Sequence, residues 1–170
     1  MQAELLVLRL VHVLGGIFWV GSGLFTTLFL VPVLASSGAT AGQVMAGLQQ
    51  RRLFSVLPTV AFLTILSGLR LMWLTSAGFS AAYFAAPSGL TYAVSGLAAT
   101  VAFVLALLVV RPAAVRSASL AASLAAADET RRAELTAELG SLRRRGAIGS
   151  TVVIVLLVLG AAGMAVARYV

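Results

Sequence analysis

Two ionisable side chains lie within apolar stretches of this 170-residue chain, and they are the residues best able to do chemistry. His12 is the only histidine, and Arg70 carries the only charge between residues 53 and 76. A neutral imidazole can ligate a metal or haem iron, or hydrogen-bond a quinone carbonyl. A guanidinium stays charged when it is buried, so Arg70 cannot escape burial by losing its proton. Ionisable residues at such depth in apolar segments indicate a site.

Four long stretches with almost no charge must position these residues. No Asp, Glu, Lys, Arg or His occurs within 13–50, 71–110 or 146–167, and the chain is 61% apolar with only 10% charged residues. Soluble domains carry about 25% charged residues, and a bilayer core takes about 20 helical residues to cross. We therefore expect an all-α fold, a transmembrane four-helix bundle. It forms a single membrane domain over 1–170, with spans at about 5–34, 53–76, 89–110 and 148–167.

The one substantial polar segment, 111–145, lies between the third and fourth spans. Its Ala, Leu, Glu and Arg residues favour helix, and Asp128 can cap a second arm. The pattern predicts a cytoplasmic helical hairpin that extends spans three and four. This hairpin is either a self-supporting extension of the bundle or a docking surface for a partner. A third use is contact with anionic lipid through 143–145.

The basic residues orient the chain. All 12 are arginines, and the first and third connections hold nine of them: Arg51, Arg52, Arg111, Arg116, Arg131, Arg132, Arg143, Arg144 and Arg145. Because cytoplasmic loops retain positive charge, both termini are expected to be periplasmic. The formal charge of +7 thus reflects topology, and we expect no nucleic-acid partner. Arginine without lysine, together with abundant alanine, favours a bacterial source, so the expected location of this multi-pass protein is the bacterial inner (plasma) membrane that the resemblance described below implies.

The two ionisable residues reach nearly the same depth from the periplasmic side, because the first two spans run in opposite directions. Trp19 follows His12 on the first span, and Trp73 lies one turn beyond Arg70 on the second. Tyr92 stands near the outer start of the third span. We expect these five residues to line a pocket that opens toward the outer leaflet.

Several occupants and one simpler arrangement fit this pattern. Haem b would place a propionate at Arg70 and its iron, or another metal, at His12; a quinone headgroup stacked between Trp and Tyr comes next. A single histidine cannot supply both axial ligands, so Met72, Met164 or a second subunit would have to supply the other. Alternatively, His12 bonds a neighbouring hydroxyl or carbonyl and Arg70 pairs with Glu4 or reaches outward.

Several other kinds of site are excluded because the chain lacks the residues that they require. The chain has no cysteine, and so no disulfide or thiolate metal site, and without lysine it cannot form a phosphate-binding loop of the Gly-Lys type. All five acids are Glu4 or lie within 111–145, which leaves no carboxylate pair inside a span for general acid and base work. We expect no catalytic residues and no catalysis by the chain alone.

The run RLVHVLGGIFWVGSGLF at 9–25, followed by Pro32, resembles the first span of the copper-resistance D-like superfamily of small bacterial membrane proteins. The shared features are the early His12, the Trp19-X-Gly21 step and the closing proline. The run RRLFSVLPTVAFLTILSGLRLMW at 51–73 is similar to the second span of that family. The resemblance covers about half of the chain.

This resemblance implies an inner-membrane helical bundle, with copper handling in some relatives and haem binding through the first-span histidine in others. Soft-metal transport uses thioether, thiolate or several imidazole ligands, whereas this chain has four Met, no Cys and one His. The expected function is binding of haem or a similar redox-active lipophilic ligand. The alternative is a non-enzymatic accessory or assembly subunit, in a homo-oligomer or larger membrane complex, and transport of copper or a small solute comes third.

Overall fold

The computed structural model describes residues 2–37, 40–124 and 127–170, and that part of the chain is helical without a strand. It contains four helical rods long and apolar enough to cross a membrane: Gln2–Ser36, Leu53–Thr75, Pro87–Leu124 and Arg131–Tyr169. The all-helical class and the four apolar helices predicted from the charge-free stretches are confirmed. By the length and composition of its helices, the chain is a multi-pass membrane protein.

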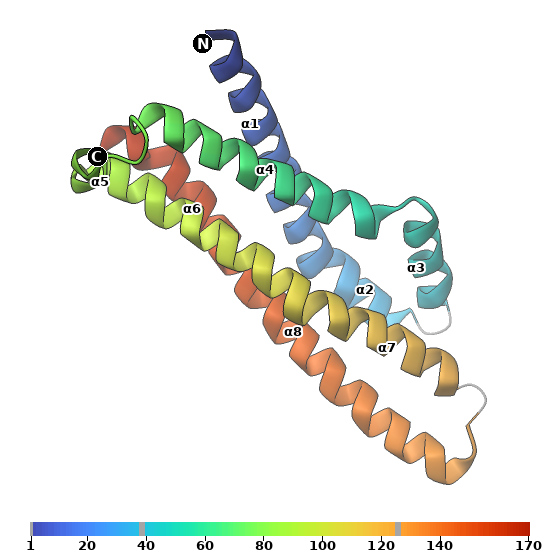
Figure 1. Ribbon diagram of the computed structural model, residues 1–170. Helices are drawn as coiled ribbons and strands as arrows, with labels where there is room; N and C mark the ends of the chain where they lie inside the picture. The colour runs from blue at the N-terminus through green and yellow to red at the C-terminus, as the bar shows by residue number, and fades with distance from the viewer. Residues whose placement is uncertain (1, 38–39, 125–126) are drawn as a thin grey trace.

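The rods are built from the following elements (Figure 1). The first half of the chain holds α1 (Gln2–Phe25), the π-helical segment η1 (Thr26–Leu30), α2 (Val31–Ser36), α3 (Thr40–Gln50) and α4 (Leu53–Thr75). The second half holds α5 (Ala81–Ala85), α6 (Pro87–Leu105), the π-helical segment η2 (Ala106–Val110), α7 (Arg111–Leu124), α8 (Glu129–Val166) and the 3₁₀ turn η3 (Ala167–Tyr169).

Consecutive rods pack as two pairs, α1 with α4 and α6 with α8, and smaller contacts of α4 with α6 and of α1 with α8 join the pairs. Both termini and α5 lie at one end of the molecule, which we call the terminal end (Figure 1). At the other end, the basic end, lie α3, the end of α7 and the start of α8. The arginines of the first and third connections therefore share one end.

The core between the pairs is small and partly aromatic. It is formed by the buried residues Trp19, Ala61, Ala102, Val153, Ile154 and Leu157. The indole of Trp19 meets the ring of Phe103 edge to face, with 6.1 Å between centroids, and Phe62 lies 6.5 Å from the same ring. Large apolar side chains elsewhere on the rods are exposed, as expected where lipid replaces water.

Glycines set how closely the two helices of each pair approach. In the first pair, a Cβ on Gly15 would collide with the hydroxyl of Thr64. In the second pair, a Cβ on Gly160 would lie 3.1 Å from the main-chain oxygen of Ser95, and one on Gly163 would collide with the Ser95 side chain. Small residues let helix backbones come together in the absence of a hydrophobic driving force.

The first and third rods share a local irregularity before a proline. The Val31 N–H bonds to the Thr26 oxygen, and the Arg111 N–H bonds to the Ala106 oxygen, so each bond spans five residues instead of four. In both rods the next residue is a proline. Proline has no N–H, and its ring crowds the carbonyl four residues earlier in a regular helix. The wider π turn absorbs the proline without ending the rod.

Other residues of the first and third rods also lie at equal distances along the sequence from these two prolines. His12 and Tyr92 stand the same number of residues before their prolines, and so do Gly15 and Ser95, the contact residues of the two pairs. Tyr92 thus stands before Pro112 as His12 stands before Pro32.

The helix α7 and the adjoining part of α8, up to residue 145, form two adjacent arms, which are the polar parts of the third and fourth rods. Asp128 caps α8 by accepting a hydrogen bond from the Arg131 N–H at 2.8 Å, and α8 then runs without interruption for 38 residues. Leu135 and Leu139 are buried on the side of α8 that faces the rest of the molecule. Because one helix forms both the polar arm and the fourth apolar rod, the arm is rigidly continuous with that rod.

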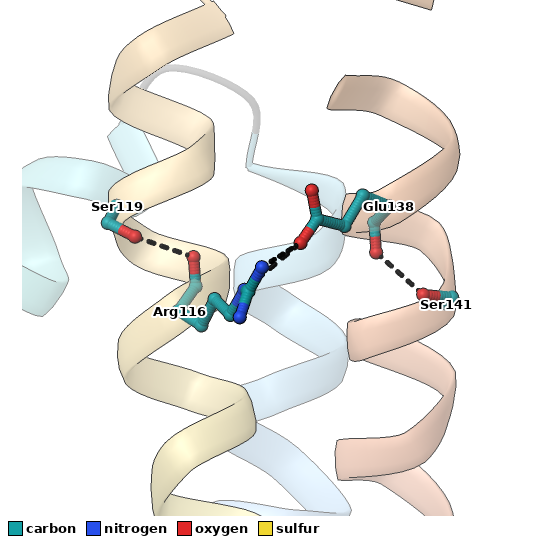
Figure 2. Close-up of polar contacts among 4 residues, drawn as sticks. All are labelled: Arg116, Ser119, Glu138 and Ser141. Atoms are coloured by element: carbon teal, nitrogen blue, oxygen red, sulfur yellow. Dashed lines mark hydrogen bonds and ion pairs between the residues drawn. The ribbon is translucent and has the colours of Figure 1, made fainter. Parts of the chain in front are cut away.

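An ion pair joins the two arms. The Arg116 guanidinium contacts a Glu138 carboxylate oxygen at 2.6 Å, and the hydroxyls of Ser119 and Ser141 donate to the main-chain oxygens of these same two residues (Figure 2). Both charged side chains are more than a third exposed, so the pair contributes at most about 1 kcal/mol. Its main effect is on the register of the arms.

Two connections are more helical than their composition indicates. The segment 35–47, whose glycine and serine content favours a turn, contains the start of α3, where Val44, Met45 and Leu48 provide an apolar side at helical spacing. The aromatic connection 78–88 contains the short helix α5. In both cases local apolar spacing prevails over the glycine and serine content.

The close contact in the second pair generates a stability prediction. Gly160→Val is expected to lower the free energy of unfolding by about 1–3 kcal/mol, because the added carbons press on the fixed main chain at Ser95. Gly21→Val is the matched control, since a Cβ at Gly21 meets nothing within 4 Å. Denaturation in mixed detergent micelles measures both. Equal effects of the two substitutions would contradict the packing described.

Candidate functional site

His12 is held by a main-chain acceptor on the neighbouring helix. Its Nδ1 lies 2.8 Å from the main-chain oxygen of Thr64 on α4, and its side chain is half-buried. A carbonyl oxygen can only accept, so Nδ1 carries the hydrogen of this bond. In the neutral imidazole Nε2 then keeps its lone pair. Histidines that ligate metals are commonly fixed in this way by a carbonyl behind the other ring nitrogen.

Gly68 makes the His12 bond possible. A Cβ on Gly68 would lie 2.7 Å from Cε1 and 2.9 Å from Nδ1 of the imidazole, closer than any real contact. The Thr64 carbonyl also accepts from the Ser67 hydroxyl at 3.0 Å, while the Thr64 hydroxyl donates to Val60. The seam between α1 and α4 is therefore a hydrogen-bonded, closely packed setting for the imidazole.

Arg70 is paired with Glu4 at the terminal end of the same two helices. Its Nε and Nη2 donate to one carboxylate oxygen at 2.9 and 2.7 Å. The two side chains are 48% and 40% exposed, so the pair contributes at most about 1 kcal/mol to stability. This is the ion-pair alternative that the sequence left open. Any external anion at Arg70 would have to compete with the Glu4 carboxylate.

The aromatic residues predicted for the pocket occupy different environments. Trp19 is 8% exposed and belongs to the core beside Phe103. Trp73 is 48% exposed and meets Phe79 edge to face at 5.2 Å. Tyr92 is half-buried near the start of α6. The structure thus places Trp19 in the interior and Trp73 at the surface of the terminal end.

Two methionines converge on Gly96 of α6. The methyl ends of Met72 and Met164 would lie 3.7 and 3.9 Å from a Cβ on Gly96, so the side chains from α4 and α8 reach the same point on α6. Met72 stands one helical turn beyond Gly68, against which His12 packs. These are the two methionines that the sequence offered as a second ligand.

An apolar groove of about 380 Å³ runs along the α1–α4 seam beside His12. It is lined by Val11, Leu14, Gly15 and Phe18 of α1 and by Val56, Val60 and Leu63 of α4. Val11 is the chain neighbour of His12, and Gly15 touches Thr64, the residue that holds the imidazole. The groove offers a lipophilic molecule an apolar surface next to the histidine.

Within residues 2–37, 40–124 and 127–170, no group of three or more His, Cys, Asp or Glu could hold a metal ion. A metal at His12 would therefore need donors of other kinds, such as thioethers.

The fold and the site define a class: the chain is a small multi-pass membrane protein made of two helix pairs, with one anchored histidine. Comparison of the chain with protein-family models, curated proteins and solved structures found no match. The resemblance to the copper-resistance D-like superfamily stays a prediction.

The bond from His12 to a carbonyl is the simpler arrangement that the sequence left open. The side-chain pattern does not reveal which main-chain oxygen accepts the bond. Gly68 could have indicated where His12 packs on the second span, because it is the one glycine in that span and lies at the depth of His12.

The anchored imidazole gives a spectroscopic prediction. With ¹⁵N-labelled histidine, the sole histidine gives one set of ring signals, and we expect the proton on Nδ1 at neutral pH. Gly68→Ala should move the ring off Thr64 and return the signals toward the free-imidazole tautomer mixture, whereas Gly21→Ala should leave them unchanged. A wild-type protein with its single ring proton on Nε2 would refute the arrangement.

Proposed function

We propose that this chain is a bacterial inner-membrane protein that binds haem, or a similar redox-active lipophilic ligand, through Nε2 of His12. The observation that supports this most directly is the bond from Nδ1 to the Thr64 oxygen at 2.8 Å. It leaves a lone pair on Nε2 and fixes the ring against rotation, which are the requirements for an axial ligand.

The proposal includes an orientation in the membrane. The basic end, with the arms α7 and α8 forming a hairpin, faces the cytoplasm, and both termini are periplasmic. Nine arginines in the connections at that end support this orientation. His12 then lies in the outer half of the bundle, within reach of a ligand that enters from the outer leaflet.

The donor set favours haem over a quinone. With its proton committed to Thr64, neutral His12 accepts at Nε2 and has no hydrogen to give to a quinone carbonyl. A bound haem would supply one-electron chemistry at its iron. Met72 and Met164, which converge on Gly96, would be the thioether donors, and the α1–α4 groove would supply an apolar wall.

Arg70 is expected to contribute less to binding an anionic group of the ligand than its charge alone would indicate. Because Glu4 already neutralises the guanidinium, a propionate at Arg70 would exchange one carboxylate partner for another. We assign the Glu4–Arg70 pair to the periplasmic rim of the site, where it can open to an anionic group without leaving a buried charge behind.

An optical spectrum of the full chain purified in mild detergent tests the proposal. We expect a Soret band, either as purified or after titration with haemin, that is lost in His12→Ala and weakened in Gly68→Ala. Gly21→Ala serves as the folding-matched control and should keep the band. Met72→Leu and Met164→Leu should shift the band if a thioether is the second ligand. A protein that takes up no haemin, or a band indifferent to His12→Ala, would rule the proposal out.

A second candidate is an accessory subunit of a larger membrane assembly, or of a homo-oligomer. The first rod favours it: Trp19 is the one residue of α1 classed as buried among those described, while Leu6, Leu14 and Ile17 are more than half exposed. The start of α1 also projects beyond the other rods (Figure 1). A colourless protein that co-purifies with partners at fixed stoichiometry would support this role instead.

A further inference from the structure

A second groove, of about 600 Å³, lies at the basic end between η2 and α8. Its lining is polar and charged in one part and apolar in the other. Ser141, Arg144 and Arg145 line one part, and Ile148, Gly149 and Val109 line the other. Residues 141, 144, 145, 148 and 149 fall on one face of α8 because they repeat at three- and four-residue spacing. The groove is cationic where α8 is polar and apolar where α8 becomes the fourth span.

Two glycines shape this groove. A Cβ on Gly140, which also lines it, would meet nothing within 4 Å, so the missing side chain leaves open space beside the arginines. A Cβ on Gly149 would lie 3.2 Å from side-chain carbons of Val109 and Val110. Gly149 thereby brings α8 close to η2 and closes the groove at its apolar side.

The arginines of the groove are available to an external anion. Among the residues that the structure describes, the ion pairs are Arg70–Glu4, Arg116–Glu138 and Arg131–Glu134, and none includes Arg144 or Arg145. Glu138, the nearest acid before them on α8, is turned to Arg116 on the other arm (Figure 2). The charges at the groove are therefore not balanced by the arms themselves.

We propose that this groove binds one anionic phospholipid of the cytoplasmic leaflet. Arg144 and Arg145 hold the headgroup phosphate, and the glycerol and upper acyl chain lie against Ile148 and Val109. A phospholipid matches both parts of the groove, because it joins a negative group to an apolar chain in the order in which α8 presents arginine and then isoleucine. The assignment rests on the proposed orientation of the chain but is independent of any ligand at His12.

Arg143 and Arg111 provide a matched control. Both lie at the same level of the chain, next to the inner ends of the third and fourth spans, and neither lines the groove. Neutralising these two removes the same charge as neutralising Arg144 and Arg145. A difference between the two double variants therefore reports the groove and not the general attraction of arginines to anionic membranes.

Native mass spectrometry of the full chain in detergent, with phosphatidylglycerol or phosphatidylcholine added, tests the site. We expect one retained phosphatidylglycerol and weak retention of phosphatidylcholine. Arg144→Gln with Arg145→Gln should weaken phosphatidylglycerol binding roughly 25-fold, at about fivefold for each charge removed. Arg111→Gln with Arg143→Gln should change it by less than about threefold. Gly140→Leu, which fills the groove and keeps every charge, should also weaken it.

Four results would overturn the proposal. The first is equal retention of the two lipids by the wild-type chain, and the second is equal loss in both double variants, which indicates diffuse surface attraction. The third is full displacement of phosphatidylglycerol by millimolar inorganic phosphate, which indicates a site for the free anion. Thermal unfolding of each variant, in parallel, distinguishes loss of the groove from loss of the fold, and an intact fold with unchanged lipid binding in Gly140→Leu also counts against the site.

Discussion

In hydrocarbon every backbone polar group of a span must find its hydrogen-bond partner within its own helix. The distance between neighbouring helices is then set by the size of the side chains between them. That constraint decides which groups come together here. Gly15 admits Thr64, and Gly68 admits the imidazole of His12, which then reaches a carbonyl that a larger side chain would have covered. In the second pair Gly160 and Gly163 admit Ser95 in the corresponding place. The anchored histidine is thus a consequence of close packing in the first pair.

The two proposed ligand sites lie toward opposite ends of the molecule. At the terminal end, the Glu4 carboxylate pairs with Arg70 beside the seam. At the basic end, arginines outnumber acids, and the groove at Arg144 and Arg145 lies where the polar arm of α8 becomes an apolar span. The uninterrupted α8 runs between the two regions, from the polar arm to Met164 near its other end.

Much of the fold followed from the sequence because absence of charge over 20 residues has few explanations besides a membrane span. The site was less predictable. Trp19 looked like a pocket residue from its spacing to His12, yet it packs on Phe103, a contact that depends on how the two pairs meet. The Thr64 acceptor belongs to the main chain, which carries no sequence signature. The α3 helix is not evident from the sequence, because its two glycines favour a turn and its apolar side is short.

The account depends most on the arginine-rich end facing the cytoplasm, since this orientation sets the leaflet that each site meets. The chain has no cysteine, so single cysteines introduced at the exposed Ala82 and Ser119 can be mapped without background. In spheroplasts, a membrane-impermeant maleimide is predicted to label the Ala82→Cys protein at once and the Ser119→Cys protein only after the membrane is opened. Labelling of Ser119→Cys in sealed spheroplasts, with Ala82→Cys protected, would contradict it.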